Sequence, residues 1–110
     1  MDIIKVSGNS RTSAVAGAIA GVFREHRRAE VQAIGAGAVN QAVKALVLAR
    51  SYLAEDGLPV VFIPEFTDVT IDDKVRTAIK FTVIEYPGEL PIGKAEEPAE
   101  AEEGEDSPQP

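Results

Sequence analysis

The chain has 110 residues, a formal net charge of −7 at pH 7, no cysteine and a single histidine, His26. Without cysteine, disulfide frameworks, thiol chemistry and cysteine-ligated zinc sites are excluded. No apolar run approaches the roughly 20 residues of a membrane-spanning helix, and the first residues lack a signal-peptide pattern. The length suits one domain, and we expect a cytoplasmic protein with no membrane partner.

The acidic charge is concentrated at the C-terminus. Residues 91–110 carry seven acidic side chains against Lys94, whereas residues 1–90 carry ten basic and eleven acidic side chains. A segment so charged and so poor in apolar residues cannot bury enough surface to offset the entropy of ordering it. We therefore predict a folded domain over residues 1–88 and a disordered acidic tail over residues 89–110. The folded part is nearly neutral, so any basic face requires segregation of charge.

In chain order, residues 2–7 are rich in β-branched side chains and predict a strand, and residues 14–28 predict a helix with one apolar stripe. The polar loop between them contains three candidate helix caps: Ser10, Thr12 and Ser13. Gly17 and Gly21 lie one turn apart in this helix, where each costs about 1 kcal/mol relative to alanine. Close backbone packing, on the second helix or on a symmetry-related copy, is the expected compensation.

Residues 31–34 predict a second strand, and residues 38–53 predict a second helix. The predicted inner stripe of this helix consists of Val39, Val43, Leu46 and Val47. Residues 58–64 form an almost continuous apolar run, typical of a covered strand, and residues 77–86 alternate as a half-buried strand does. Between these strands, residues 65–76 predict a connector with two aspartates, Asp72 and Asp73, at its tip.

The order β-α-β-α-β-β predicts the α+β class. Right-handed crossovers between the strands place both helices on one face of a four-stranded mixed sheet, which gives a two-layer sandwich. The other face of the sheet stays open. Such a face is solvated, functional or buried in an oligomer.

The elbow before the second helix is a candidate anion-binding loop, formed by Gly35, Ala36 and Gly37. A helix start presents unpaired N–H groups and a partial positive charge, and glycine allows a phosphate to approach closely. The elbow does not match the dinucleotide-binding fingerprint, because Asn40 stands where the third glycine would be. It does not match a Walker loop either, because no Gly-Lys-Ser/Thr sequence is present. The alternative interpretation is a plain turn whose small residues let the helix pack on the sheet.

Basic and amide side chains near the predicted strand ends form a second candidate site. Parallel strands end at the same edge of a sheet, so the loop after the first strand should meet the start of the second helix. Phosphate contacts there would make binding fall steeply with salt, whereas the alternative is an ordinary solvated surface. The predicted nucleic-acid-binding residues are Lys5, Asn9, Arg11, Asn40, Gln41, Lys44, Arg76 and Lys80.

No catalytic residue, cofactor or metal site is predicted, and a non-enzymatic protein is expected. His26 has no second histidine or cysteine with which to form a nucleophilic or metal site. Asp68, Asp72 and Asp73 could serve acid–base chemistry or hold a metal, but turn-forming aspartates are commoner. Phe66 could stack on a base or tuck the connector onto the core.

Four stretches of the chain, in the order in which they occur, resemble the stage V sporulation protein S family. They are KVSGNSRTSAVAGAIAGVFREH, AEVQAIGAGAVNQAVKALVLARSYL, FIPEFTD and RTAIKF. The most distinctive piece is AIGAGAVNQAVKA. The resemblance extends from about residue 3 to residue 86 and leaves out the acidic tail, because short members of the family end near the last strand.

This family is similar in turn to the Alba-like fold of small chromatin and RNA-binding proteins. The resemblance implies DNA or RNA binding by a homodimer or homotetramer with a regulatory role in sporulation or related developmental or cell-cycle control. In Alba-like proteins, basic residues of two loops meet the phosphates. The matching loops here are residues 8–11, which retain Arg11, and residues 35–40, which present backbone N–H groups and Asn40 instead of cations.

Two other functions are compatible with the residues themselves. A protein-interaction or assembly module without nucleic-acid binding is favoured by the near-neutral folded part and the uncharged elbow. A small-anion sensor that uses the elbow is the third possibility.

Overall fold

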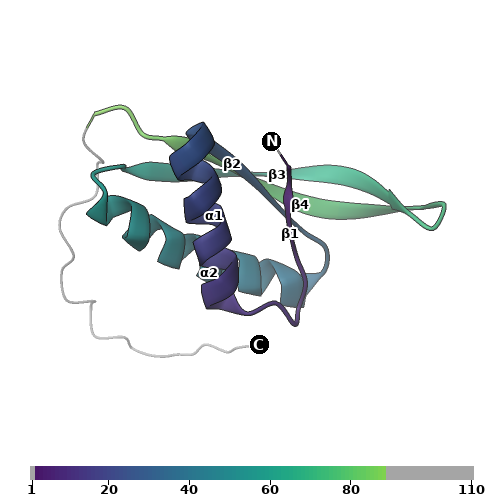
Figure 1. Ribbon diagram of the computed structural model, residues 1–110. Helices are drawn as coiled ribbons and strands as arrows, with labels where there is room; N and C mark the ends of the chain where they lie inside the picture. The colour runs from purple at the N-terminus through teal and green to yellow at the C-terminus, as the bar shows by residue number, and fades with distance from the viewer. Residues whose placement is uncertain (1, 89–110) are drawn as a thin grey trace, which may run out of the picture.

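The computed structural model of the chain describes residues 2–88. Across these residues the chain forms two helices and four strands in the predicted order β-α-β-α-β-β (Figure 1). The elements are β1 (Ile4–Val6), α1 (Thr12–His26), β2 (Arg28–Ala33), α2 (Ala36–Glu55), β3 (Val60–Ile71) and β4 (Lys74–Glu85). The predicted acidic tail lies outside the described residues.

The strands of residues 2–88 form one mixed sheet in the order β1-β2-β4-β3. β1 and β2 pair in parallel, so α1 crosses over between them, while β4 pairs antiparallel with both β2 and β3. Both helices lie on the same face of this sheet (Figure 1), and the predicted α+β class and two-layer arrangement are confirmed. The outer strand β3 contains Pro64, and proline is confined to sheet edges because it has no N–H to donate.

β3 and β4 form a long hairpin that projects beyond the rest of the sheet (Figure 1). β2 pairs with β4 only as far as Ala33–Ile79, so the outer hairpin residues pair only with each other. The connector predicted over residues 65–76 is therefore wrong. This stretch has no buried face, and so it lacks the apolar–polar alternation that reveals a half-buried strand. Asp72 and Asp73 do form its tip, with the positive φ angles of 51° and 65° that a two-residue hairpin turn requires.

The hydrophobic core lies between the helices and one face of the sheet. α1 contributes Ile19 and Phe23 and α2 contributes Leu46 and Leu53, all essentially inaccessible to solvent. The sheet contributes alternate residues, because successive side chains of a strand point to opposite faces. Its buried members include Val6, Val31, Ala33, Val60, Phe81 and Val83. The apolar stripe predicted for the first helix is thus confirmed.

α2 faces the core mainly with alanine. Its buried residues are Ala38, Ala42, Ala45, Leu46, Ala49 and Leu53. Of the predicted inner stripe, Leu46 is buried, but Val43 and Val47 are 43% and 56% exposed. The prediction assigned the larger valine side chains to the core face. The structure uses alanine there, because small side chains let α2 pack closely against the rest of the core.

Gly17 and Gly21 lie on the outer face of α1. Within residues 2–88, a Cβ built on either glycine would have no atom of another element within 4 Å. The expected packing of these glycines against the second helix is therefore wrong. Packing of a symmetry-related copy on this face stays a prediction.

Gly17→Ala and Gly21→Ala should each raise the free energy of unfolding by about 0.5–1 kcal/mol, because alanine loses less conformational freedom on entering a helix. Urea unfolding followed by circular dichroism measures the change. Ala18→Gly, at an exposed position of the same helix, is the matched control and should lower stability by a similar amount. A loss of stability in the two glycine variants would show that another molecule packs closely on this face.

Candidate nucleic-acid interface

The two loops predicted to carry the function meet at one edge of the sheet. A Cβ built on Gly37, in the first turn of α2, would lie 3.8 Å from the Cα of Gly8, in the loop after β1. The backbones come together because β1 and β2 are parallel neighbours and so end at the same edge. We call this edge the loop rim and define it as residues 7–12 and 35–44 (Figure 1).

The loop after β1 is a closed turn held by its own serines. The Ser10 backbone N–H donates to the Ser7 carbonyl at 3.1 Å, and the Ser7 N–H donates to Ser10 Oγ at 2.9 Å. The Asn9 N–H also donates to Ser7 Oγ, at 3.2 Å. Because its hydroxyl is engaged in the turn, Ser10 does not cap α1. The N-cap of α1 is Arg11, without a side-chain cap bond, so all three predicted caps are wrong.

Gln41 ties the loop rim together. Its Nε2 donates to the Ser10 carbonyl at 2.8 Å and to Thr12 Oγ1 at 3.2 Å. These bonds join the second turn of α2 to the start of α1, and the Gln41 side chain is half-buried. The amide nitrogen that was predicted to reach a nucleic acid thus holds the two loops in place. The exposed amide of its neighbour Asn40 has no such engagement among the described residues.

Both helices begin at the loop rim without a side-chain cap. α1 starts after Arg11, and α2 starts after Gly35, whose φ of 93° suits glycine. Neither first turn contains an acidic residue. The sequence has no Asp or Glu from residue 3 to residue 24 or from residue 31 to residue 54. No carboxylate of these segments therefore offsets the partial positive charge of the two helix starts.

Ion pairs divide the cations into two sets. Within residues 2–88, the arginine ion pairs are Arg24–Asp56, Arg27–Glu85 and Arg28–Glu30, at the end of the sheet away from the loop rim. No ion pair in this range includes the predicted binding cations, which are Lys5, Arg11, Lys44, Arg76 and Lys80. Their charge is therefore not compensated by a contacting carboxylate of the described chain.

The remaining predicted cations lie on the open face of the sheet. The strand register places four polar side chains in one row across this face: Lys5, Gln32, Lys80 and Glu65. Beside the row, a hollow of about 560 Å³ separates β1 from the hairpin and is lined by Lys5 and Arg76. Ser7 and Gly8 also line this hollow, so it is continuous with the loop rim.

The structure thus brings the predicted residues together as two adjoining groups. The two loops and the helix starts that meet at the rim carry Asn9, Arg11, Asn40, Gln41 and the elbow of Gly35, Ala36 and Gly37, and Lys44 follows in the third turn of α2. The open sheet face holds Lys5, Arg76 and Lys80. In the rim group Gln41 is half-buried and the other predicted contacts are exposed, whereas Lys80 is half-buried and shares its row with Glu65.

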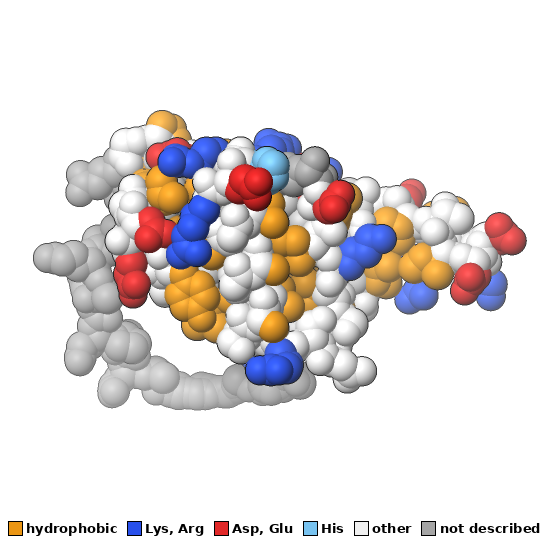
Figure 2. Space-filling model, in the orientation of Figure 1, with side chains coloured by type: hydrophobic (Ala, Val, Ile, Leu, Met, Phe, Trp, Pro, Cys, Tyr) orange, Lys and Arg blue, Asp and Glu red, His pale blue; other side chains and the backbone are white. Residues whose placement is uncertain are grey.

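An apolar groove that the sequence reasoning missed borders the loop rim on the helix side of the hairpin. It is a hollow of about 570 Å³ between α2 and the hairpin, and its lining includes Val39, Val43, Phe66 and Ile79. Phe66 is 78% exposed, so the expectation that it tucks onto the core is wrong. Figure 2 shows apolar side chains exposed along the hairpin and charged ones at its tip. The missed signal was a second stripe on α2, of valines at a spacing of four, beside alanines that already supply the core face.

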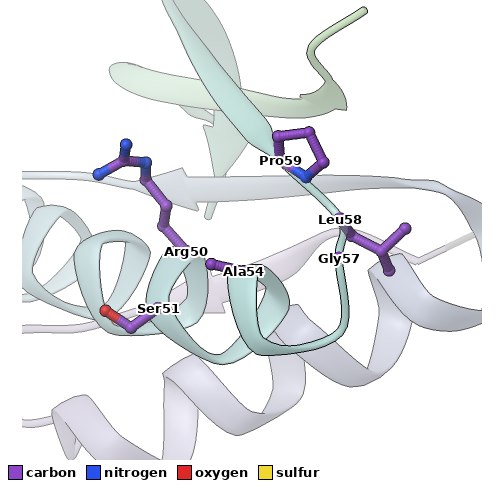
Figure 3. A pocket seen from close by; sticks show the side chains of 6 residues that line it. All are labelled: Arg50, Ser51, Ala54, Gly57, Leu58 and Pro59. Atoms are coloured by element: carbon purple, nitrogen blue, oxygen red, sulfur yellow. The ribbon is translucent and has the colours of Figure 1, made fainter. Parts of the chain in front are cut away.

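A third hollow, of about 320 Å³, lies at the C-terminal end of α2 (Figure 3). It is lined by Arg50, Ser51, Ala54, Gly57, Leu58 and Pro59. Arg50 and Ser51 point away from each other (Figure 3), so these two polar side chains do not converge on a common ligand. This hollow is therefore not a candidate site.

The described residues contain neither a membrane-spanning helix nor a metal-binding cluster. No helix in residues 2–88 is long and apolar enough to cross a bilayer. No three His, Asp or Glu side chains in that range are placed to hold a metal ion together. His26 is exposed at the end of α1, with Nε2 3.9 Å from Oε1 of Glu25.

Gln41→Ala should lower the free energy of unfolding by about 1 kcal/mol, because the Ser10 carbonyl and the Thr12 hydroxyl lose their donor. Asn40→Ala removes an exposed amide from the same turn and should change stability by less than about 0.5 kcal/mol. Urea unfolding of both full-length variants measures the difference. Equal effects would contradict the structural role of Gln41.

Comparison with known protein families identifies the family to which the chain belongs. The family model described as Stage V sporulation protein S (SpoVS) matches residues 2–86. The match begins before β1, ends just after β4 and includes the whole loop rim. The resemblance found in the sequence is thereby confirmed over the entire described fold. The chain belongs to the stage V sporulation protein S family.

Proposed function

We propose that this protein binds DNA or RNA without catalysing a reaction, and that it acts as a homo-oligomeric regulator. Membership of the SpoVS family supports a sporulation-related role. The observation that supports the proposal is the loop rim, where two helices start without a side-chain cap and where Arg11 and, in the third turn of α2, Lys44 form no ion pair within residues 2–88. Phosphate groups are stabilised by helix N-termini and by arginine and lysine.

The charges on the surface limit how strong this binding is. Five unpaired cations are available on the loop rim and the open sheet face, and residues 1–88 are neutral overall, with ten basic and ten acidic side chains. If each cation contacts one phosphate of duplex DNA, the slope of log Kobs against log salt is at most about −4.5. Affinity would then fall by about 500-fold between 50 and 200 mM salt. Binding is therefore strong only at low salt, or when several copies bind together.

A homodimer supplies the second copy. The exposed Phe66 ring stands beside the apolar groove, and Val43 and Val47 form an exposed ridge on α2. In a two-fold dimer each Phe66 enters the groove of the partner, because an isologous interface presents the same patch twice. Burial of this patch would remove the largest exposed apolar side chain of the described fold from water.

The same groove also favours the alternative function, a protein-interaction or assembly module without nucleic-acid binding. A partner protein with an apolar anchor would occupy it in place of the second copy. Titration with nucleic acid at low salt separates the two functions, because only the first requires the cations of the loop rim.

Arg11→Gln and Lys44→Gln should each weaken binding by about tenfold at 50 mM salt and reduce the salt slope by about 0.9, because each removes one phosphate contact. Fluorescence anisotropy with labelled duplex DNA and single-stranded RNA over a salt series measures both quantities. Arg27→Gln removes the same charge from a cation already paired with Glu85 and is the matched control. An equal loss in the control, or no binding by the unaltered protein at low salt, would refute the loop rim as the interface.

Phe66→Ser should weaken dimerisation by at least about 100-fold, because burial of a phenylalanine contributes about 1.5–3 kcal/mol and a two-fold dimer buries two. Sedimentation velocity over a range of protein concentrations measures the dissociation constant. Ile63→Ser changes an exposed apolar residue of the same strand on the open face of the sheet and should leave the dimer intact. A monomeric unaltered protein would contradict the proposed dimer.

A further inference from the structure

The net charge of the whole chain resides in its last 22 residues. Residues 89–110 contain eight acidic side chains and one lysine, whereas residues 1–88 contain ten basic and ten acidic side chains. The acidic segment therefore has a polyanionic composition like that of the nucleic acid that the loop rim is proposed to bind. The molecule thus carries both a surface with unpaired cations and a polyanion of its own.

Most of the cations near the start of the acidic segment already have partners among the described residues, and the exception is Arg50, which lies beside Pro59. Gly88 follows β4, and the last residues of β4 pair with the first residues of β2 and β3, at the end of the sheet away from the loop rim. At that end Arg27 and Arg28 are paired with glutamates of the described chain. Arg11 and Lys44, which form no ion pair within residues 2–88, belong instead to the loop rim. The rim contains no Asp or Glu, so an added carboxylate would form new ion pairs there without displacing an existing one.

The segment is long enough to reach the loop rim. The rim lies near the level of the Ala33–Ile79 pair, about 30 Å along β4 from Gly88 at the rise of a β-strand. Twenty-two residues span up to about 70 Å when extended. The segment can therefore cross the molecule and still place its carboxylates, most of them between residues 96 and 106, against the rim.

We propose that the acidic segment 89–110 occupies the loop rim when no nucleic acid is bound and competes with the phosphate backbone for Arg11 and Lys44. Competition between the segment and nucleic acid rests on the proposed function, whereas binding of the segment to the loop rim does not. A tethered segment has an effective concentration in the millimolar range, and individual exposed ion pairs are weak. The segment therefore weakens nucleic-acid binding by about two- to tenfold at 50 mM salt, and screening removes the effect as salt rises.

Occupancy is tested without nucleic acid. The chain has no cysteine, so Ser107→Cys in the full-length protein provides one attachment point for a spin label. We expect paramagnetic broadening of the backbone amide signals of Asn9, Arg11, Asn40 and Lys44 at 50 mM salt, which is lost in an Arg11→Gln/Lys44→Gln variant. Arg50→Gln removes an unpaired cation at the far end of α2 and should leave the broadening unchanged. Rim amides that are not broadened, or broadening that survives the double variant, would overturn the occupancy.

Competition is tested by titrating labelled DNA and RNA into two altered full-length proteins. In one, the seven acidic residues between 96 and 106 become Gln or Asn; in the other, residues 95–106 are shuffled at constant charge. The neutral segment should tighten binding about two- to tenfold at 50 mM salt and not at 500 mM, and the shuffled segment should behave like the original. If the neutral segment tightens nucleic-acid binding but the rim amide signals of the spin-labelled protein are not broadened, the acidic segment only repels nucleic acid at long range. That outcome overturns the proposal. If no protein binds nucleic acid, the proposed function fails, and the broadening experiment still decides the occupancy.

Discussion

The parallel pairing of β1 with β2 is the constraint on which the candidate functional surface depends. It brings Gly8 and Gly37, which are 29 residues apart in the chain, so close together at one edge of the sheet that a Cβ on either would touch the backbone of the other. The same pairing makes both helices start at that edge, so their unpaired N–H groups lie near each other. If β1 were instead antiparallel to β2, the loops would lie at opposite ends of the sheet and no loop rim would form.

The way in which α2 packs determines what else the surface presents. Because alanines supply most of the buried face of α2, its valines Val43 and Val47 lie on the exposed side. The long hairpin then stands beside this valine ridge and closes the apolar groove next to the loop rim. A polar surface suited to phosphates and an apolar surface suited to another protein chain thus adjoin each other, and Asn40 borders both.

Much of the fold could be predicted from the sequence, because its elements with one buried face have clear periodicity. The order of elements, the stripe of α1 and the meeting of the two loops all follow from local pattern and from the rules of strand connection. The arm of the hairpin could not be predicted, because residues 65–76 have no buried side and so no pattern to read. The inner face of α2 was misjudged because two stripes, one of alanine and one of valine, compete on one helix.

The candidate site was predictable in position but not in the roles of its members. Asn40 and Gln41 are adjacent amides in sequence, and no single-sequence signal distinguishes the exposed one from the one that holds the Ser10 carbonyl. That difference arises from the contact between α1 and α2, which is a tertiary property. The division between paired and unpaired arginines likewise depends on partners such as Asp56, which is 32 residues away from Arg24.

The proline in the outer strand has a consequence for the exposed edge of the sheet. β3 is twelve residues long and, in the sheet of residues 2–88, has no partner strand on one side of its backbone, an arrangement that favours strand-to-strand growth into fibres. Pro64 interrupts the row of amide donors near the middle of that side, and Glu65 and Asp68 add charge next to it. The proline and these charges therefore disfavour continuous strand-to-strand pairing at this edge.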